Sequence, residues 1–204
     1  MTAAIVKLDP IRPEAAFARC REVIRSGGVI AYPTETFYGL GVDPANPAAV
    51  QRLLAIKERE PDRPILLLIS GPDEVAHWAS SVTPAARAMM ERHWPGPLTL
   101  VFMANRNVPP ALSSGTGTIG LRVPGSETTR RLLAFLGTAL TGTSANRAGG
   151  PSPATADGVF KEVGDRIELI LDGGETPGGL PSTVVDVTGS SPRVIREGAI
   201  EIRV

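Results

Sequence analysis

The sequence predicts an α/β fold, with helices packed on one twisted mixed β-sheet, as a single domain over residues 1–204. Three observations predict it. Early in the chain, segments with helical spacing of apolar residues alternate with short apolar runs typical of strands. At the end, such runs lie too close together for helical crossovers, which disfavours a doubly wound order. Hydrophobic residues make up 42% of the chain, enough for an ordinary core.

Local signals place the elements in order. Residues 13–26 put Phe17, Cys20 and Ile24 on one helix face, and later helices begin at capping residues, two of them followed by proline. The expected helices are 13–26, 46–59, 83–92, 126–136 and 156–163. The expected strands are 29–32, 65–69, 98–103, 118–123, 138–141, 167–171, 183–187, 193–196 and 200–204.

The balance of charge limits the classes of function. Lys plus Arg number 21 and Asp plus Glu number 21, whereas proteins dedicated to duplex nucleic acid are usually basic. A small anion is therefore the favoured ligand. The single cysteine, Cys20, excludes an internal disulfide and is typical of a reducing compartment. The apolar run at 65–69 is far shorter than the roughly 20 residues of a membrane span, so a cytoplasmic location without membrane contact is expected.

Several familiar motifs fail on inspection. Gly115–Gly120 matches G-x-G-x-x-G, but extended residues follow it, so a turn that leads into a strand is expected. No Walker motif is present, and Gly142–Asn146 lacks the final glycine of a nucleophile elbow. His77 and His93 each lie beside a tryptophan on an expected helix, and no metal site in the protein is predicted.

Hydroxyl-bearing residues follow two expected strands. Tyr32–Gly41 contains Thr34 and Thr36 after a buried strand, and Thr141–Asn146 leads to a Gly- and Pro-rich loop that holds Ser152. Loops at strand ends are favoured places for polar ligands. The alternative for both segments is a turn stabilised by its own hydroxyls.

Cations gather at two other places. Lys57, Arg59 and Arg63 lie at the end of an expected helix, where they either clamp a triphosphate or simply complement the helix dipole. Alternation puts Thr118 and Arg122 on one strand face, where the arginine either binds a carboxylate or lies exposed.

Taken in order, these segments resemble the YrdC/TsaC family of threonylcarbamoyl-AMP synthases. The resemblance runs from about Ala15 to Gly198 and rests on Y-P-T-E-T-x-Y-G-L, K-x-R, R-x-P, S-x-N and S-T-V-V-D in family order. The chain looks like the form without an extra C-terminal domain. Two departures are Leu68, where some relatives have histidine, and Ala154, where relatives often have threonine.

The resemblance implies a fold around a concave, positively charged cavity and an adenylate synthase that uses L-threonine, bicarbonate, ATP and Mg²⁺. It implies that Thr36, Arg122 and Ser182 contact threonine, and that Lys57, Arg59, Ser144 and Asn146 form the catalytic group. It implies ATP contacts from Arg59, Arg63, Thr118, Asn146, Ser152 and Arg196. The product would pass to a complex that modifies adenosine 37 of tRNA.

Three alternatives remain open at this point. A paralogue that binds RNA or nucleotide without synthase activity would share the motifs. A carbamoyl-transfer module like that of hydrogenase-maturation proteins normally lies within a much longer chain. A plain nucleotide-binding module would bind ATP without releasing pyrophosphate.

Overall fold

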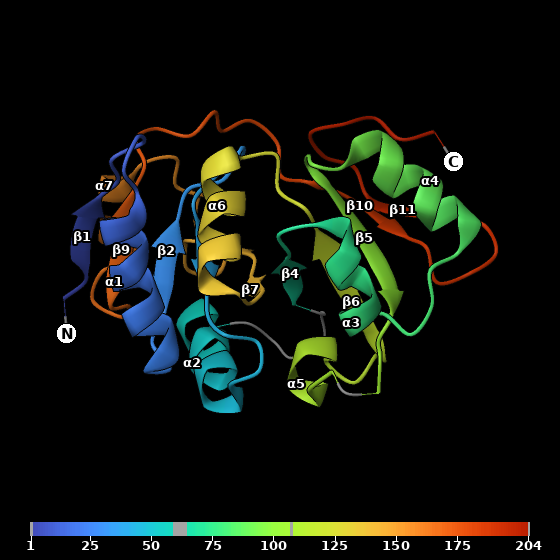
Figure 1. Cartoon of the computed structure of the whole chain (residues 1–204), viewed down its shortest axis with the longest axis horizontal. Coiled ribbons are helices and arrows are strands. Elements are labelled where there is room, and N and C mark those ends of the chain that lie inside the picture. The colour runs from blue at the N-terminus through green and yellow to red at the C-terminus, as the bar shows by residue number, and fades with distance from the viewer. Residues whose placement is uncertain (1, 59–64, 107, 204) are drawn as a thin grey trace.

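The α/β class is confirmed, but the strands form two mixed sheets rather than one (Figure 1). The computed structural model describes residues 2–58, 65–106 and 108–203. The first sheet has the order β1-β9-β2-β3-β8 and contains β1 (Ala4–Lys7), β2 (Ile30–Tyr32), β3 (Gly39–Gly41), β8 (Thr143–Ser144) and β9 (Leu169–Asp172). The second has the order β11-β10-β5-β6-β4-β7 and contains β4 (Leu66–Leu68), β5 (Leu98–Met103), β6 (Thr118–Arg122), β7 (Leu140–Thr141), β10 (Thr183–Asp186) and β11 (Arg193–Arg196).

The two sheets meet where one chain segment changes sheet at Gly142. Thr141 ends β7 and pairs with Leu67 in the second sheet, whereas Thr143 begins β8 and pairs with Leu40 in the first. The N–H of Gly142 donates to the carbonyl of Leu66 at 2.7 Å, and a Cβ at this position would lie 3.0 Å from the Leu68 side chain. The expected strand at 138–141 thus belongs to the second sheet, and the chain continues across Gly142 into the first sheet, which sequence periodicity does not reveal.

The five helices with predicted bounds begin and end close to those bounds. The helices of the described chain are α1 (Glu14–Arg25), α2 (Pro47–Lys57), α3 (Val75–Trp78), α4 (Pro84–His93), α5 (Pro110–Ser113), α6 (Glu127–Leu136) and α7 (Ala156–Val163), with a 3₁₀ turn at Pro72–Glu74. Asn46, Thr83 and Ser126 each accept hydrogen bonds from N–H groups of the first turn, as their positions predicted. None of the helices in the described part of the chain is long and apolar enough to cross a bilayer.

Some strand predictions need correction. Residues 200–203 form no strand; instead Ile200 exchanges hydrogen bonds with the Thr183 hydroxyl. The short elements β1, β3, β8 and α5 were not predicted, because two to four residues are too few to show a period. The helix expected at His77 is α3, for which no bounds were predicted. Gly115 and Gly117 both have positive φ and lead into β6, so the predicted turn before that strand is confirmed.

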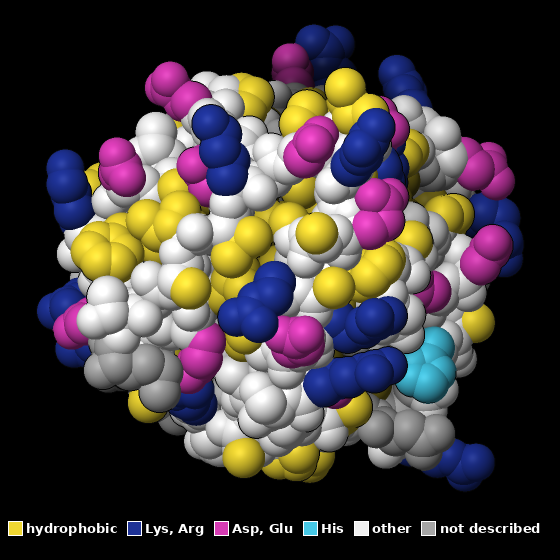
Figure 2. Space-filling model, turned by 60° about the vertical axis from the view of Figure 1, so that its left-hand side comes forward, with side chains coloured by type: hydrophobic (Ala, Val, Ile, Leu, Met, Phe, Trp, Pro, Cys, Tyr) yellow, Lys and Arg dark blue, Asp and Glu magenta, His cyan; other side chains and the backbone are white. Residues whose placement is uncertain are grey.

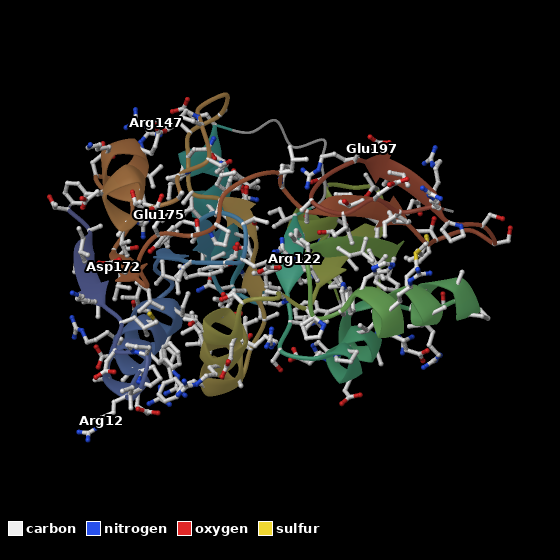
Figure 3. All side chains as sticks on the ribbon, turned by 90° about the horizontal axis from the view of Figure 1, so that it is seen from above. Arg12, Arg122, Arg147, Asp172, Glu175 and Glu197 are labelled. Carbon is white, nitrogen blue, oxygen red and sulfur yellow. The ribbon has the colours of Figure 1, made fainter. Side chains whose placement is uncertain are left out.

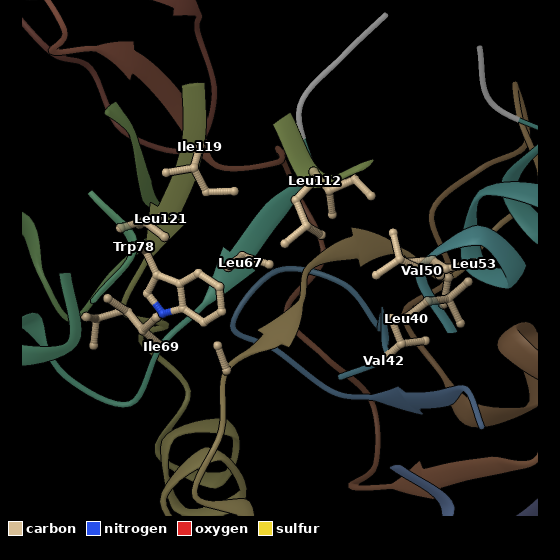
Figure 4. Packing of buried hydrophobic residues seen from close by; sticks show 14 of the residues in the cluster. Leu40, Val42, Val50, Leu53, Leu67, Ile69, Trp78, Leu112, Ile119 and Leu121 are labelled. Atoms are coloured by element: carbon tan, nitrogen blue, oxygen red, sulfur yellow. The ribbon is translucent and has the colours of Figure 1, made fainter. Parts of the chain in front are cut away.

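Apolar side chains fill the space between the sheets and their helices. Leu67 on β4, with Ile119 and Leu121 on β6, packs in the main cluster, close to Trp78 of α3 (Figure 4). A second cluster joins α1 to α6, where the rings of Phe17 and Phe135 lie 5.7 Å apart. Because Ile119 and Leu121 point into the core, the alternate residues of β6 point the other way.

Gly198 is predicted to be intolerant of any side chain. A Cβ there would lie 2.2 Å from the Pro181 carbonyl oxygen and 2.6 Å from the Ser182 carbonyl carbon, both backbone atoms. We expect Gly198→Ala to lower the free energy of unfolding by about 1–3 kcal/mol, the usual cost of overpacking. Gly189→Ala is the control, since its Cβ would meet only an atom at 3.9 Å. Equal stability of both variants in urea denaturation would contradict the close approach.

Candidate active site

A cavity of about 960 Å³ is lined by residues of both sheets and of the loops between them. Every predicted site residue within the described part of the chain lines it: Thr36, Lys57, Thr118, Arg122, Ser144, Asn146, Ser152, Ser182 and Arg196. Arg59 and Arg63, also predicted, lie outside the described residues. These nine residues lie up to 160 positions apart in the sequence, from Thr36 to Arg196, and the fold brings them together around one cavity.

Lys57, in the last turn of α2, holds the loop that carries Ser144 and Asn146. Its ammonium donates to the Ser144 carbonyl at 2.7 Å, to the Asn146 carbonyl, and to the Asn146 side-chain oxygen at 3.2 Å. The side chain is only 7% exposed, so these charged hydrogen bonds compensate for burying the charge. In this arrangement Lys57 positions the S-x-N segment.

Asn146 extends the same network into the following turn. Its amide nitrogen donates to the carbonyls of Arg147, at 2.8 Å, and Gly150. The amide therefore links Lys57 to the Gly-rich loop that leads to Ser152. Ser144 is left half-buried, with its hydroxyl 3.5 Å from the Lys57 nitrogen.

Thr34 fixes the direction of the Thr36 hydroxyl. The Thr34 hydroxyl has one hydrogen, and it donates that hydrogen to the carbonyl of Phe37 at 2.7 Å. The 3.1 Å contact between the two threonine hydroxyls must then take its hydrogen from Thr36. Thr36 consequently presents lone pairs to the cavity and accepts hydrogen bonds there.

Thr116 and Thr118 repeat this arrangement on the other sheet. Thr116 donates to the Ser113 carbonyl at 2.6 Å, so the 2.8 Å contact with Thr118 takes its hydrogen from Thr118. Both pairs have T-x-T spacing, and in both the second backbone N–H also donates to the first hydroxyl at 3.2 Å. Thr118 is therefore suited to accept from a ligand N–H or O–H rather than to donate to a phosphate.

Arg122 is buried, not exposed, and pairs with Glu35. The guanidinium is 5% exposed and its Nη2 donates to Glu35 Oε1. Its Nε is buried without a hydrogen-bond partner among the described residues. Figure 3 shows Arg122 near the middle of the molecule. The guanidinium keeps donor capacity for a ligand acceptor.

The carboxyl group of Glu35 is ionised. Burial raises the pKa of this carboxyl group. The charge of Arg122 and hydrogen bonds from backbone N–H groups, including that of Gly125, lower the pKa by more than burial raises it, so it lies below the ordinary value. A lowered folded-state pKa stabilises the fold at neutral pH, and that contribution is lost as pH falls through the folded-state value.

The stability of Glu35→Gln relative to wild type should therefore depend on pH. At pH 7 the variant should be less stable, because glutamine lacks the charge that compensates Arg122. The difference should shrink as pH falls below the ordinary range of glutamate, about 4.3. Chemical denaturation of both proteins between pH 7 and pH 3 measures it, and a difference independent of pH would show that the ionised carboxylate does not carry the effect.

Ser182, directly before β10, forms a further polar group with Thr99 of β5 and Arg196 of β11. Its hydroxyl lies 2.9 Å from that of Thr99, and Arg196 Nη2 donates to the Ser182 carbonyl at 2.7 Å and to the hydroxyl at 3.3 Å. Ser182 and Thr99 are 3% and 4% exposed, so their hydroxyl groups are satisfied by each other and by Arg196 rather than by solvent.

Cations outnumber anions among the described residues that line the cavity. Lys57, Arg122, Arg147 and Arg196 line it, against one carboxylate, Asp186. Figure 2 shows basic and acidic side chains interspersed on one outer face, in keeping with a net charge of zero. The cationic excess is a local property of the cavity and favours an anionic ligand.

The described residues contain no group of three or more His, Cys, Asp and Glu side chains placed to hold a metal. Asp186 accepts from the Thr188 hydroxyl at 2.6 Å and pairs with Arg193 at 3.3 Å. Burial raises its pKa, and the hydrogen bonds from Thr188 and Arg193 bring it below the ordinary value, so Asp186 is charged. A divalent ion here would rely on oxygen atoms of the ligand for most of its coordination.

Sequence reasoning gave no individual role to four residues that shape the site, although Thr34 was noted among the hydroxyls at a strand end: Thr34, Glu35, Thr99 and Thr116. The repeated T-x-T spacing was a signal for Thr34 and Thr116, since a hydroxyl two residues away is within local reach. Glu35 and Thr99 gave no such signal, because their partners Arg122 and Ser182 are 87 and 83 residues away.

Comparison with known proteins agrees with this geometry. The family Sua5_yciO_yrdC, described as telomere recombination, matches residues 22–198. A Thiobacillus denitrificans protein named threonylcarbamoyl-AMP synthase is 40% identical over 164 residues, which cover 80% of this chain and 87% of the relative. A Pyrococcus abyssi protein of the same name is 36% identical over 179 residues, which cover 88% of this chain.

The chain spans about half the length of the Pyrococcus abyssi relative, 53%. The crystal structure of P. abyssi Sua5 complexed with L-threonine superposes with a TM-score of 0.92 at 34% identity, over 96% of this chain and 58% of that one. The relatives carry the name of an enzyme, and the family match extends over nearly all of the cavity-lining residues. The chain belongs to the Sua5/YciO/YrdC family.

Proposed function

We propose that this protein is a threonylcarbamoyl-AMP synthase, a nucleotidyltransferase that joins L-threonine, bicarbonate and ATP and releases pyrophosphate. The observation that carries the proposal is the convergence of nine predicted residues on one cationic cavity. The name and the L-threonine complex of the family members support the choice of substrate. A cytoplasmic location and transfer of the product to a tRNA-modifying complex complete the proposal.

The reaction balances without a protein nucleophile. The threonine amine attacks bicarbonate, water leaves, and a carbamate forms. A carbamate oxygen then attacks the α-phosphorus of ATP, and the bond to the β-phosphate oxygen breaks to release pyrophosphate. Catalysis is then positioning and charge stabilisation, for which fixed hydrogen-bonding groups in a cavity are suited.

The proposal divides the side chains between threonine and ATP. Arg122 would bind the amino-acid carboxylate, and Thr36, as an acceptor, would receive a hydrogen bond from the amine or hydroxyl of threonine; the pairing of Arg122 with Glu35 and the contact of Thr36 with Thr34 support these roles. Lys57 holds Ser144 and Asn146 at the wall where the carbamate and phosphates would lie. Thr118 would accept from the nucleoside part of ATP, and Arg196 and Ser152 would complete the ATP contacts.

Mg²⁺ belongs to the proposal as a companion of ATP. When bound, it would neutralise charge on the phosphate oxygens. Among the described residues that line the cavity, Asp186 is the one carboxylate. Because Mg²⁺ prefers oxygen ligands, Asp186 is the side chain that would bind such an ion.

Release of pyrophosphate tests the proposal. Purified protein is given ATP and Mg²⁺, and threonine and bicarbonate are omitted in turn. Release that requires both substrates is expected. Release with neither indicates a general ATP hydrolase, and no release from folded protein that binds ATP indicates a binding paralogue. A steep decrease of RNA affinity with salt would identify that paralogue as a nucleic-acid binder.

A further inference from the structure

Glu35 lies behind Arg122 rather than in the cavity. Arg122 lines the cavity, whereas Glu35 is not among the lining residues and its side chain is 18% exposed. The two side chains are 87 residues apart in sequence and meet because β6 and the loop after β2 approach each other. The carboxylate thus contacts the arginine from the protein side and leaves the cavity side to a ligand.

The second oxygen of Glu35 is tied to the start of α6. Glu35 Oε2 accepts from the backbone N–H of Ser126 at 3.2 Å. A Cβ on Gly125 would lie 3.3 Å from Glu35 Oε1, so glycine there permits the close approach. Ser126 is itself fixed, since its hydroxyl caps α6 by accepting from the N–H of Thr129 at 3.3 Å.

The loop that carries Glu35 is fastened to the same helix by a second bond. The hydroxyl of Thr129 donates to the carbonyl of Pro33 at 2.6 Å. Arg130 donates to the carbonyls of Pro124 and Gly125, each at 2.7 Å. The carboxylate is therefore held in place at the start of α6 by bonds that involve only protein groups.

A fixed carboxylate determines how Arg122 meets a ligand. A guanidinium binds a carboxylate well only when its planar set of donors faces both oxygens. Glu35 occupies Nη2 on one side, and the buried Nε has no partner among the described residues. Without Glu35, Arg122 would keep its charge but lose the bond that defines its orientation.

We propose that Glu35 is a positioning residue for the reaction, because it holds the Arg122 guanidinium in the orientation that binds the carboxylate of the amino-acid substrate. The inference rests on the proposed function, since it assigns that carboxylate to Arg122. Glu35 does not line the cavity, and it would act on the substrate only through Arg122.

Pyrophosphate release by wild type, Glu35→Gln and Glu35→Asp tests the role of Glu35. Glu35→Gln should raise KM for L-threonine by about tenfold or more, a loss of about 1.4 kcal/mol in binding, while KM for ATP stays within about twofold. Glu35→Asp, which keeps the charge, should recover part of the loss. Glu127→Gln, at the exposed first residue of α6, is the control and should match wild type.

A second measurement separates positioning from a general structural defect. Binding of L-threonine and of L-threoninamide, which lacks the carboxylate, is measured by calorimetry. Wild type should prefer threonine, and Glu35→Gln should lose most of that preference, whereas a structural defect would weaken both ligands equally. Equal weakening, or an unchanged KM for threonine, overturns the role of Glu35. Wild type that releases no threonine-dependent pyrophosphate contradicts the proposed function instead, before any variant is compared.

Discussion

Lys57→Met is expected to lower threonine-dependent pyrophosphate release by at least about 100-fold, the scale seen when a fixed electrostatic donor is removed from an active site. The buried ammonium donates to two backbone carbonyls and one side-chain oxygen of the 144–146 loop. Methionine keeps the length of the side chain but donates nothing. Ser144 and Asn146 would then lose the group that sets their positions.

The same substitution should lower the free energy of unfolding by about 2–4 kcal/mol, because it leaves buried carbonyl groups without their charged donor. Urea denaturation measures the stability, and a pyrophosphate assay at a temperature where both proteins are folded measures the rate. Lys161→Met, at an exposed position on α7, is the control. Full activity in a folded Lys57→Met protein would show that the loop does not depend on this lysine.

Arg122→Met is the second substitution with a large expected effect. It removes the predicted partner of the substrate carboxylate and leaves Glu35 as a partly buried charge without compensation. Breaking one side of such a pair typically costs about 3–5 kcal/mol, discounted here because Glu35 keeps some contact with water. Threonine-dependent turnover should fall below detection, because the carboxylate of the substrate loses its predicted cationic partner.

The double variant Glu35→Gln/Arg122→Met separates the two effects. Replacing both charges removes the uncompensated carboxylate, so stability should return toward wild type while activity stays lost. Denaturation of the four proteins of the cycle gives the coupling free energy of the pair. Arg131→Met, whose side chain is 43% exposed, controls for loss of a surface arginine. A double variant as unstable as Arg122→Met would mean that Glu35 is not stabilised by this pairing.

Much of the local structure follows from neighbouring residues alone. Asn46, Thr83 and Ser126 cap their helices by bonds to groups two or three residues away, so their sequence positions suffice. Alternation along β6 likewise placed Arg122 on the face opposite Ile119 and Leu121. The order of the motifs also sufficed to identify the family, which the match over residues 22–198 confirms.

The tertiary structure alone decided how the strands and charges are paired. Sequence periodicity predicted one sheet, because nothing in Leu140–Ser144 indicates that the strand changes sheets at Gly142. The sequence left open whether Lys57 clamps a triphosphate or complements the helix dipole, and only the fold places it on carbonyls 87 and 89 residues away. Glu35 stands within the Y-P-T-E-T-x-Y-G-L motif, but only the fold shows that it pairs with Arg122. Local sequence fixes dihedral preferences and the face of each element, whereas contacts between distant residues depend on how those elements pack.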